Sequence, residues 1–126
     1  MKILILGAGQ VGYSLAETLV SEKNDITVVE IVPERVKALQ DTFDLRAIEG
    51  NASNPDILRQ AGAEDTDLVV AATQSDETNL VACKICAMLF NVPTRIARIA
   101  SSDYLMPELM GDTGFAVTHS IYPEQV

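Results

Sequence analysis

The sequence predicts an α/β domain in which helices cover both faces of a parallel six-stranded sheet, a doubly wound arrangement. Short, nearly continuous apolar runs alternate with longer amphipathic stretches along the 126 residues. Such runs are typical of parallel strands that are buried on both faces. A chain of this length is about one domain. Its hydrophobic content of 48% is sufficient for a core without disulfides or a structural metal.

Six apolar runs are the predicted strands, at residues 3–6, 26–29, 45–48, 68–72, 96–99 and 115–117. Five predicted helices lie between them, at residues 10–22, 33–42, 54–61, 76–90 and 104–110. Pro33 suits a first helical turn, Asn54 and Ser75 suit helix N-termini, and Gly62 suits a helix end. Strict alternation implies right-handed crossovers, and ligands of such sheets bind beyond the carboxyl ends of the strands.

Composition excludes several classes of function. The formal net charge of −9 argues against nucleic acid as a partner and against direct binding to anionic lipid, because both attract basic surfaces. The apolar run at the N-terminus stops at Gly7, too short for a signal peptide, and no run reaches the roughly 20 residues of a membrane span. Two cysteines form no disulfide framework. The sequence therefore predicts a soluble cytoplasmic protein.

The strongest local signal is a glycine-rich loop that directly follows the first apolar run and opens an amphipathic helix: Gly7-Ala8-Gly9-Gln10-Val11-Gly12. In a Rossmann-like fold, the first glycine permits the turn and the second lets the backbone approach a pyrophosphate. The third lets the helix pack closely on the strand. Phosphates then lie against free N–H groups at the helix N-terminus. The alternative interpretation is an ordinary strand-to-helix turn.

An acidic residue completes this pattern. Glu30 ends the second apolar run, about 20 residues beyond the loop, where a carboxylate accepts hydrogen bonds from the adenosine ribose. A carboxylate also repels a 2′-phosphate, so NAD(H) is favoured over NADP(H). Arg35 lies nearby and is able to accommodate a phosphate, but we interpret it as an exposed residue of the second helix.

Three further loops share the same predicted edge of the sheet. Asn51 follows the third strand and is placed to bond the adenine edge; Thr73 and Gln74 follow the fourth strand, near the second ribose or the nicotinamide. Arg98 lies in the fifth strand and adds one positive charge. Each of them taken alone is equally well explained as turn chemistry or a solvated charge.

No catalytic group is evident. Cys83 and Cys86 have C-x-x-C spacing, but they lie inside a predicted helix and are interpreted as small buried residues rather than a redox pair. His119 is the only histidine and is interpreted as a loop residue after the last strand. The predicted functional residues all bind and none reacts. The rival hypothesis is an NAD-dependent dehydrogenase fragment that lacks its substrate domain.

Several segments together resemble the TrkA family, nucleotide-binding regulators of bacterial and archaeal potassium uptake that are related to the RCK/KTN domains of potassium channels. The resemblance lies in residues 2–12, 24–30, 75–83, 95–99 and 120–125. The S-D-E-T-N stretch at 75–79 and the I-A-R-I stretch at 96–99 are more specific than the glycine loop. The family commonly has aspartate where this chain has Asn51, so that contact keeps an acceptor but loses a charge.

The resemblance implies a non-enzymatic cytoplasmic subunit, peripheral to the plasma membrane, that binds NAD(H), or ATP or ADP, and controls a TrkH-type potassium transporter. It implies dimer-based homo-oligomers. It also implies that residues 1–126 form one RCK N-terminal domain whose last residues, about 119–126, lead toward a crossover helix and a C-terminal domain. Carried over residue by residue, the nucleotide contacts are the loop residues from Gly7 to Val11 together with Glu30, Asn51, Thr73, Gln74 and Arg98.

Overall fold

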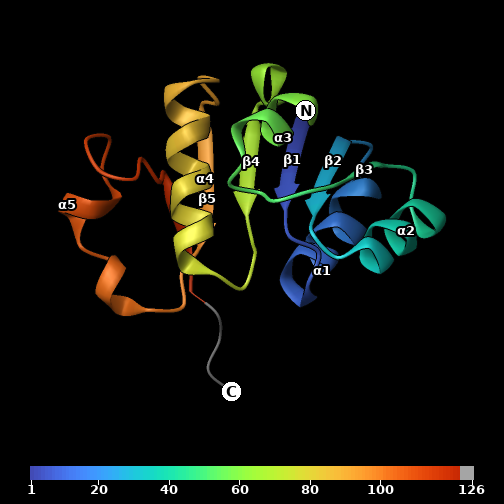
Figure 1. The fold of residues 1–126 in the computed structure, drawn as a ribbon, viewed down its shortest axis with the longest axis horizontal. Coiled ribbons are helices and arrows are strands. Elements are labelled where there is room, and N and C mark those ends of the chain that lie inside the picture. Colours follow the sequence, from blue (N-terminus) through green and yellow to red (C-terminus); the bar gives the residue numbers. More distant parts are fainter. Residues whose placement is uncertain (123–126) are drawn as a thin grey trace.

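One parallel sheet of six strands, ordered β3-β2-β1-β4-β5-β6, organises the computed structural model, which describes residues 1–122 (Figure 1). The strands are β1 (Lys2–Leu6), β2 (Asp25–Glu30), β3 (Arg46–Glu49), β4 (Leu68–Ala71), β5 (Thr94–Arg98) and β6 (His119–Ile121). The helices are α1 (Gln10–Val20), α2 (Pro33–Thr42), α3 (Pro55–Gln60), α4 (Asp76–Met88) and α5 (Pro107–Met110). All neighbouring strands are parallel, which confirms the predicted doubly wound, Rossmann-like sheet.

Two hydrophobic clusters lie on opposite faces of this sheet. On one face, α1 and α2 pack their apolar sides on β1, β2 and β3, with Ala16 and Leu39 fully buried. On the other face, α3 and α4 pack on β1, β4 and β5, with Leu58 and Leu80 buried. Strand β1 contributes to both clusters through alternate residues, which explains why its sequence is continuously apolar. No helix within residues 1–122 has both the length and the apolarity needed to cross a membrane.

The predicted turn residues perform their expected roles. Pro33 occupies the first turn of α2, and the Asn54 side chain accepts hydrogen bonds from two backbone N–H groups of α3. Gly62 adopts a left-handed conformation (φ +87°) just after α3, and the Ser75 side chain caps α4 by accepting from the Thr78 N–H. Local sequence signals therefore place these helix ends correctly.

The predictions fail in the segment after β5. The last strand is at His119–Ile121, not at 115–117, so His119 lies in a strand rather than in a loop. The apolar residues Phe115 and Val117 belong to the loop before it and pack on the α4-side cluster. Strand β6 is an edge strand that is partly exposed, so it lacks the apolar composition of a buried strand.

The predicted helix at 104–110 is only partly confirmed, because the helix is confined to Pro107–Met110. Residues Ser102–Tyr104 form a 3₁₀ turn, and a separate short helix, α5, begins at Pro107. Met106 is extended (ψ 136°) because proline disfavours the helical conformation in the residue before it. The prediction that the last residues lead toward a crossover helix falls largely on 123–126, which lie outside the described residues.

Candidate functional site

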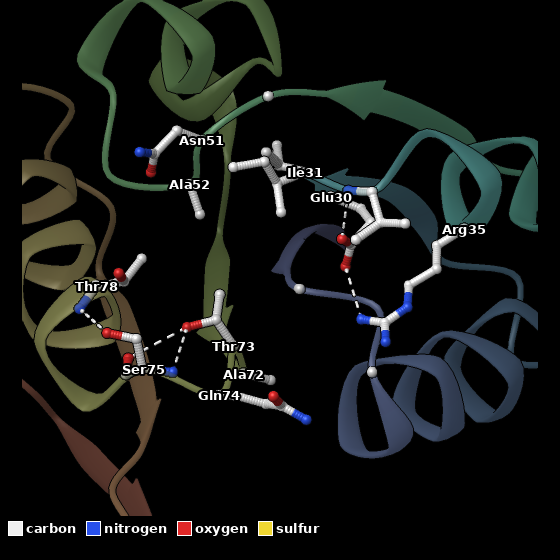
Figure 2. A pocket seen from close by; sticks show the side chains of 15 residues that line it. Glu30, Ile31, Arg35, Asn51, Ala52, Ala72, Thr73, Gln74, Ser75 and Thr78 are labelled. Atoms are coloured by element: carbon white, nitrogen blue, oxygen red, sulfur yellow. Dashed lines mark hydrogen bonds and ion pairs between the residues drawn. The ribbon is translucent and has the colours of Figure 1, made fainter.

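A cavity of about 420 Å³ opens where the carboxyl ends of β1, β2, β3 and β4 meet (Figure 2). It is bounded by the glycine loop before α1, the ends of β2 and β3, the β4–α4 loop and one side chain of α2. The chain order reverses between β1 and β4, whose ends lie side by side at this edge. The cavity therefore occupies the switch point at which open α/β sheets bind ligands.

The glycine loop forms one wall of the cavity through its backbone. Gly7 has φ +95°, and a Cβ there would lie 2.9 Å from the backbone of Thr73, so this glycine lets the two walls approach each other. A Cβ on Gly12 would collide with the Gly7 carbonyl group, so Gly12 permits α1 to pack on the loop. The predicted roles of these two glycines agree with the geometry.

Gly9 differs from the other two loop glycines. A Cβ there would have nothing closer than 3.9 Å, where it would meet Nη1 of Arg35, and the backbone is extended (φ −72°, ψ −159°). Gly9 occupies the N-cap position of α1 without a side-chain cap. The open space above Gly9 and the uncapped helix N-terminus together form a cradle that is open to a phosphate group.

Glu30 joins the first wall to the end of β2. Its side chain is only 4% exposed; Oε1 accepts a hydrogen bond from the Ala8 N–H and Oε2 accepts one from the Val32 N–H, each at 2.7 Å. Arg35 approaches Oε1 at 3.9 Å. Each carboxylate oxygen keeps a free lone pair, because a carboxylate accepts about four hydrogen bonds. Glu30 thus holds the glycine loop and is still able to bind ribose hydroxyls.

The opposite wall, after β4, is held by side chains. Asn79 is fully buried in α4; its Oδ1 accepts from the N–H and hydroxyl of Thr73, and its Nδ2 donates to the carbonyls of Thr73 and Arg98. Asp76 accepts hydrogen bonds at 2.8 Å from the N–H groups of Ala100 and Ser101. These two residues of the S-D-E-T-N stretch therefore fix the β4–α4 loop to the end of β5.

Six of the predicted site residues line the cavity: Gly7, Gly9, Glu30, Asn51, Thr73 and Gln74. The remainder, Ala8, Gln10, Val11, Gly12 and Arg98, do not. Arg98 donates from Nη1 to the Thr73 carbonyl, and its buried Nε has no partner among the described residues. Asn51 uses its Oδ1 in a turn with Ser53, and its amide nitrogen donates to no described residue.

Sequence reasoning missed other residues at this site. Arg35 is an exposed residue of the second helix, as expected, but it also lines the cavity and pairs with Glu30, and the apolar Ile31 lines it too. Asn79 belongs to the stretch that carried the resemblance, but no role was assigned to it; Asp76, in the first turn of α4, was expected only to favour the helix dipole. For Asn79, the signal was a short polar side chain inside a helix, away from the helix ends where such residues act as caps.

The cysteines take no part in this site. Cys83 and Cys86 are buried in α4, and burial raises the pKa of each thiol to about 12. A reactive cysteine needs a lowered pKa and access to solvent. Their interpretation as small buried residues is confirmed.

Comparison with known proteins decides the family, because the TrkA-N domain model matches residues 3–123. The chain belongs to the TrkA-N family. It is 52% identical over its whole length to the Trk system potassium uptake protein TrkA of Vibrio alginolyticus and to that of Haemophilus influenzae. It spans only 28% of the length of either relative.

Solved structures show the same fold. The TrkA-N domain of the Escherichia coli inner membrane protein ybaL has a TM-score of 0.84 at 23% identity, covering 96% of this chain and 86% of that one. The GsuK channel bound to NAD has a TM-score of 0.79 at 18% identity, covering 95% of this chain and 21% of the channel. The TrkA-N assignment and the Rossmann-like architecture therefore agree.

Proposed function

We propose that this TrkA-N domain binds an adenine nucleotide in the cavity, NAD(H) first and ATP or ADP as alternatives, and that binding regulates a partner rather than supporting catalysis. The observation that carries the proposal is the pairing of an open cradle over Gly9 with a buried carboxylate, Glu30, at the switch point. The GsuK channel, whose fold is similar, is bound to NAD in its solved structure, which supports the choice of NAD(H).

Most of the predicted residues have a role in nucleotide binding in this proposal. The N–H groups from Gly9 to Val11 hold the phosphates, and Glu30 accepts the adenosine ribose hydroxyls. Asn51 bonds the adenine edge through its amide nitrogen. This nitrogen donates no hydrogen bond to any described residue. Thr73 and Gln74 face the second ribose or the nicotinamide. Arg98 contributes indirectly, by donating a hydrogen bond to the Thr73 carbonyl. Its buried Nε is left without a hydrogen-bond partner among the described residues.

The proposal extends to a regulatory partner. Relatives that share half of the sequence are named Trk system potassium uptake proteins. We propose that residues 1–126 form one nucleotide-binding RCK N-terminal domain of a cytoplasmic subunit, which acts peripherally on a TrkH-type membrane transporter. A ligand regulates only through different affinities for two conformations, so nucleotide would bias how paired domains pack in a dimer-based assembly.

Calorimetric titration with NAD⁺, NADH, ATP and ADP tests the binding step. We expect binding by the wild-type chain and its loss in Gly9→Val, whose added side chain fills the cradle while the fold is kept. Gly111→Ala, a glycine variant outside the cavity lining, is the control and should bind normally. Failure of all four nucleotides to bind at millimolar concentration would remove the proposal.

Two further measurements separate regulation from other functions. In the dehydrogenase hypothesis, NADH absorbance falls when candidate keto acids are added; in the regulatory proposal, the cofactor binds without turnover. Light scattering with and without nucleotide tests the dimer-based assembly. An identical mass and shape in both states would contradict regulation through domain packing.

A further inference from the structure

Among the residues that the structure describes, Arg35 is the only cationic side chain that lines the cavity, and Glu30 is the only carboxylate there. It projects from the first turn of α2 across the mouth of the site toward the glycine loop (Figure 2). Its Nη1 lies 3.9 Å from Glu30 Oε1 and the same distance from the position a Cβ on Gly9 would take. Nη1 of Arg35 is therefore equally close to the carboxylate that is predicted to bind the ribose and to the space that is predicted to hold a phosphate.

The donors of this guanidinium are not used. No described residue accepts a hydrogen bond from the Arg35 side chain, whose distance to Glu30 is too long for one and which is 49% exposed. Arg95 shows the contrast: it donates at 2.5 Å to the carbonyls of Ala116 and Val92, and is 11% exposed. Arg95 is a structural clamp, whereas Arg35 keeps several donors available to a ligand.

Removing Arg35 from Glu30 leaves no unpaired buried charge. The Glu30 carboxylate keeps its two backbone N–H partners whether or not the guanidinium is present. The contact with Glu30 is therefore a weak ion pair, and the guanidinium is able to leave it and bind an anion above Gly9. The glycine loop itself supplies no lysine or arginine, so Arg35 is the side-chain charge available to a phosphate there.

We propose that Arg35 is a specificity-determining residue that binds the phosphate on the 5′ side of the adenosine whose ribose Glu30 holds. This proposal rests on the proposed nucleotide-binding function. The site then selects adenosine compounds that carry a 5′-phosphate, such as 5′-AMP, ADP and NAD(H), over the unphosphorylated nucleoside. A 2′-phosphate gains nothing from this arrangement, because it would meet the Glu30 carboxylate first.

The test compares Arg35→Gln with Lys37→Gln, which removes a charge from the same helix at a residue paired with Asp41 outside the cavity. Both variants are checked by thermal unfolding and then titrated with 5′-AMP, adenosine, NAD⁺ and NADP⁺. We expect the preference for 5′-AMP over adenosine to fall about tenfold in Arg35→Gln and to stay unchanged in Lys37→Gln. The salt dependence of 5′-AMP binding should also weaken in Arg35→Gln only.

Other outcomes are distinguishable. An unchanged preference for 5′-AMP in a folded Arg35→Gln variant would overturn the role of Arg35 and leave the proposed function intact. A selective loss of NADP⁺ binding would overturn it too, since Arg35 would then contact a 2′-phosphate. Absence of binding by the wild-type chain to all four probes would refute the proposed function, and this inference with it.

Discussion

The two walls of the cavity are built by different means. The wall of β1, α1 and β2 consists of glycine backbone held by one buried carboxylate, Glu30. The wall of β4, α4 and β5 is held by side chains, with Asn79 making four hydrogen bonds to Thr73 and Arg98. The first wall is a surface for a ligand's charged groups, and the second is a rigid support. A substitution at Gly9 on the first wall should therefore change binding without changing stability, whereas a substitution at Asn79 on the second wall should lower stability.

The largest expected effect is at Gly12. In Gly12→Ala the new Cβ collides with the Gly7 carbonyl, and backbone on both sides cannot move aside without separating α1 from the sheet. We expect a loss of about 3 kcal/mol or more in the free energy of unfolding, measured in urea. Gly9→Ala is the matched control, with nothing closer than 3.9 Å, and should change stability by less than about 0.5 kcal/mol. Equal losses in both variants would erase the distinction within the loop.

On the second wall, we expect the largest loss of stability from a substitution at Asn79. Asn79→Ala leaves the Thr73 N–H and the Arg98 carbonyl without their partner in a fully buried site. We expect the free energy of unfolding, measured in urea, to fall by about 2–4 kcal/mol. Thr78→Ala, in the same turn, is the control and should be nearly neutral because its hydroxyl makes no hydrogen bond with the described residues. A neutral Asn79→Ala would mean that the wall is held by packing alone.

A smaller effect is expected at Glu30. Glu30→Gln replaces one acceptor oxygen by an NH₂ group, so either the Ala8 or the Val32 N–H loses its partner. We expect a loss of about 1–3 kcal/mol, measured by denaturant unfolding, together with weaker nucleotide binding. Glu49→Gln is the matched control, since Glu49 pairs with Glu30 in the strand register and is exposed. If the two variants lose the same amount of stability, the Glu30 side chain does not hold the glycine loop to the end of β2.

The smallest expected effect on the free energy of unfolding comes from the two thiols of α4, and it depends on pH. Burial raises the pKa of Cys83 and of Cys86 from 9.0 to about 12, so only the unfolded chain releases these protons between those values. Stability should be unaffected by the thiols below pH 9 and should fall as pH rises toward 12. The slope is up to about 1.4 kcal/mol per pH unit for each thiol. Unfolding measured from pH 8 to pH 10 in wild type and Cys86→Ala should show a shallower slope in the variant.

The first wall was predictable because its signals are local. The glycine loop follows its strand directly, and Glu30 ends the next strand, so spacing along the chain suffices. Arg35 is an exposed residue of α2, as expected, but its place in the cavity lining was not predictable, because an exposed guanidinium on a helix has the same sequence pattern whether or not it reaches a cavity. Its approach to Gly9 depends on how α2 packs beside α1 on the sheet.

By itself, the sequence determined the alternation of strands and helices, the helix ends at Asn54 and Ser75, and the glycine loop with its acid. These features depend on burial patterns and on contacts between residues close in the chain. Only the tertiary structure decided the second wall, because the Asn79–Arg98 contact joins segments that the sheet brings together. It also decided where β6 lies, since an edge strand buries too little surface to need an apolar sequence.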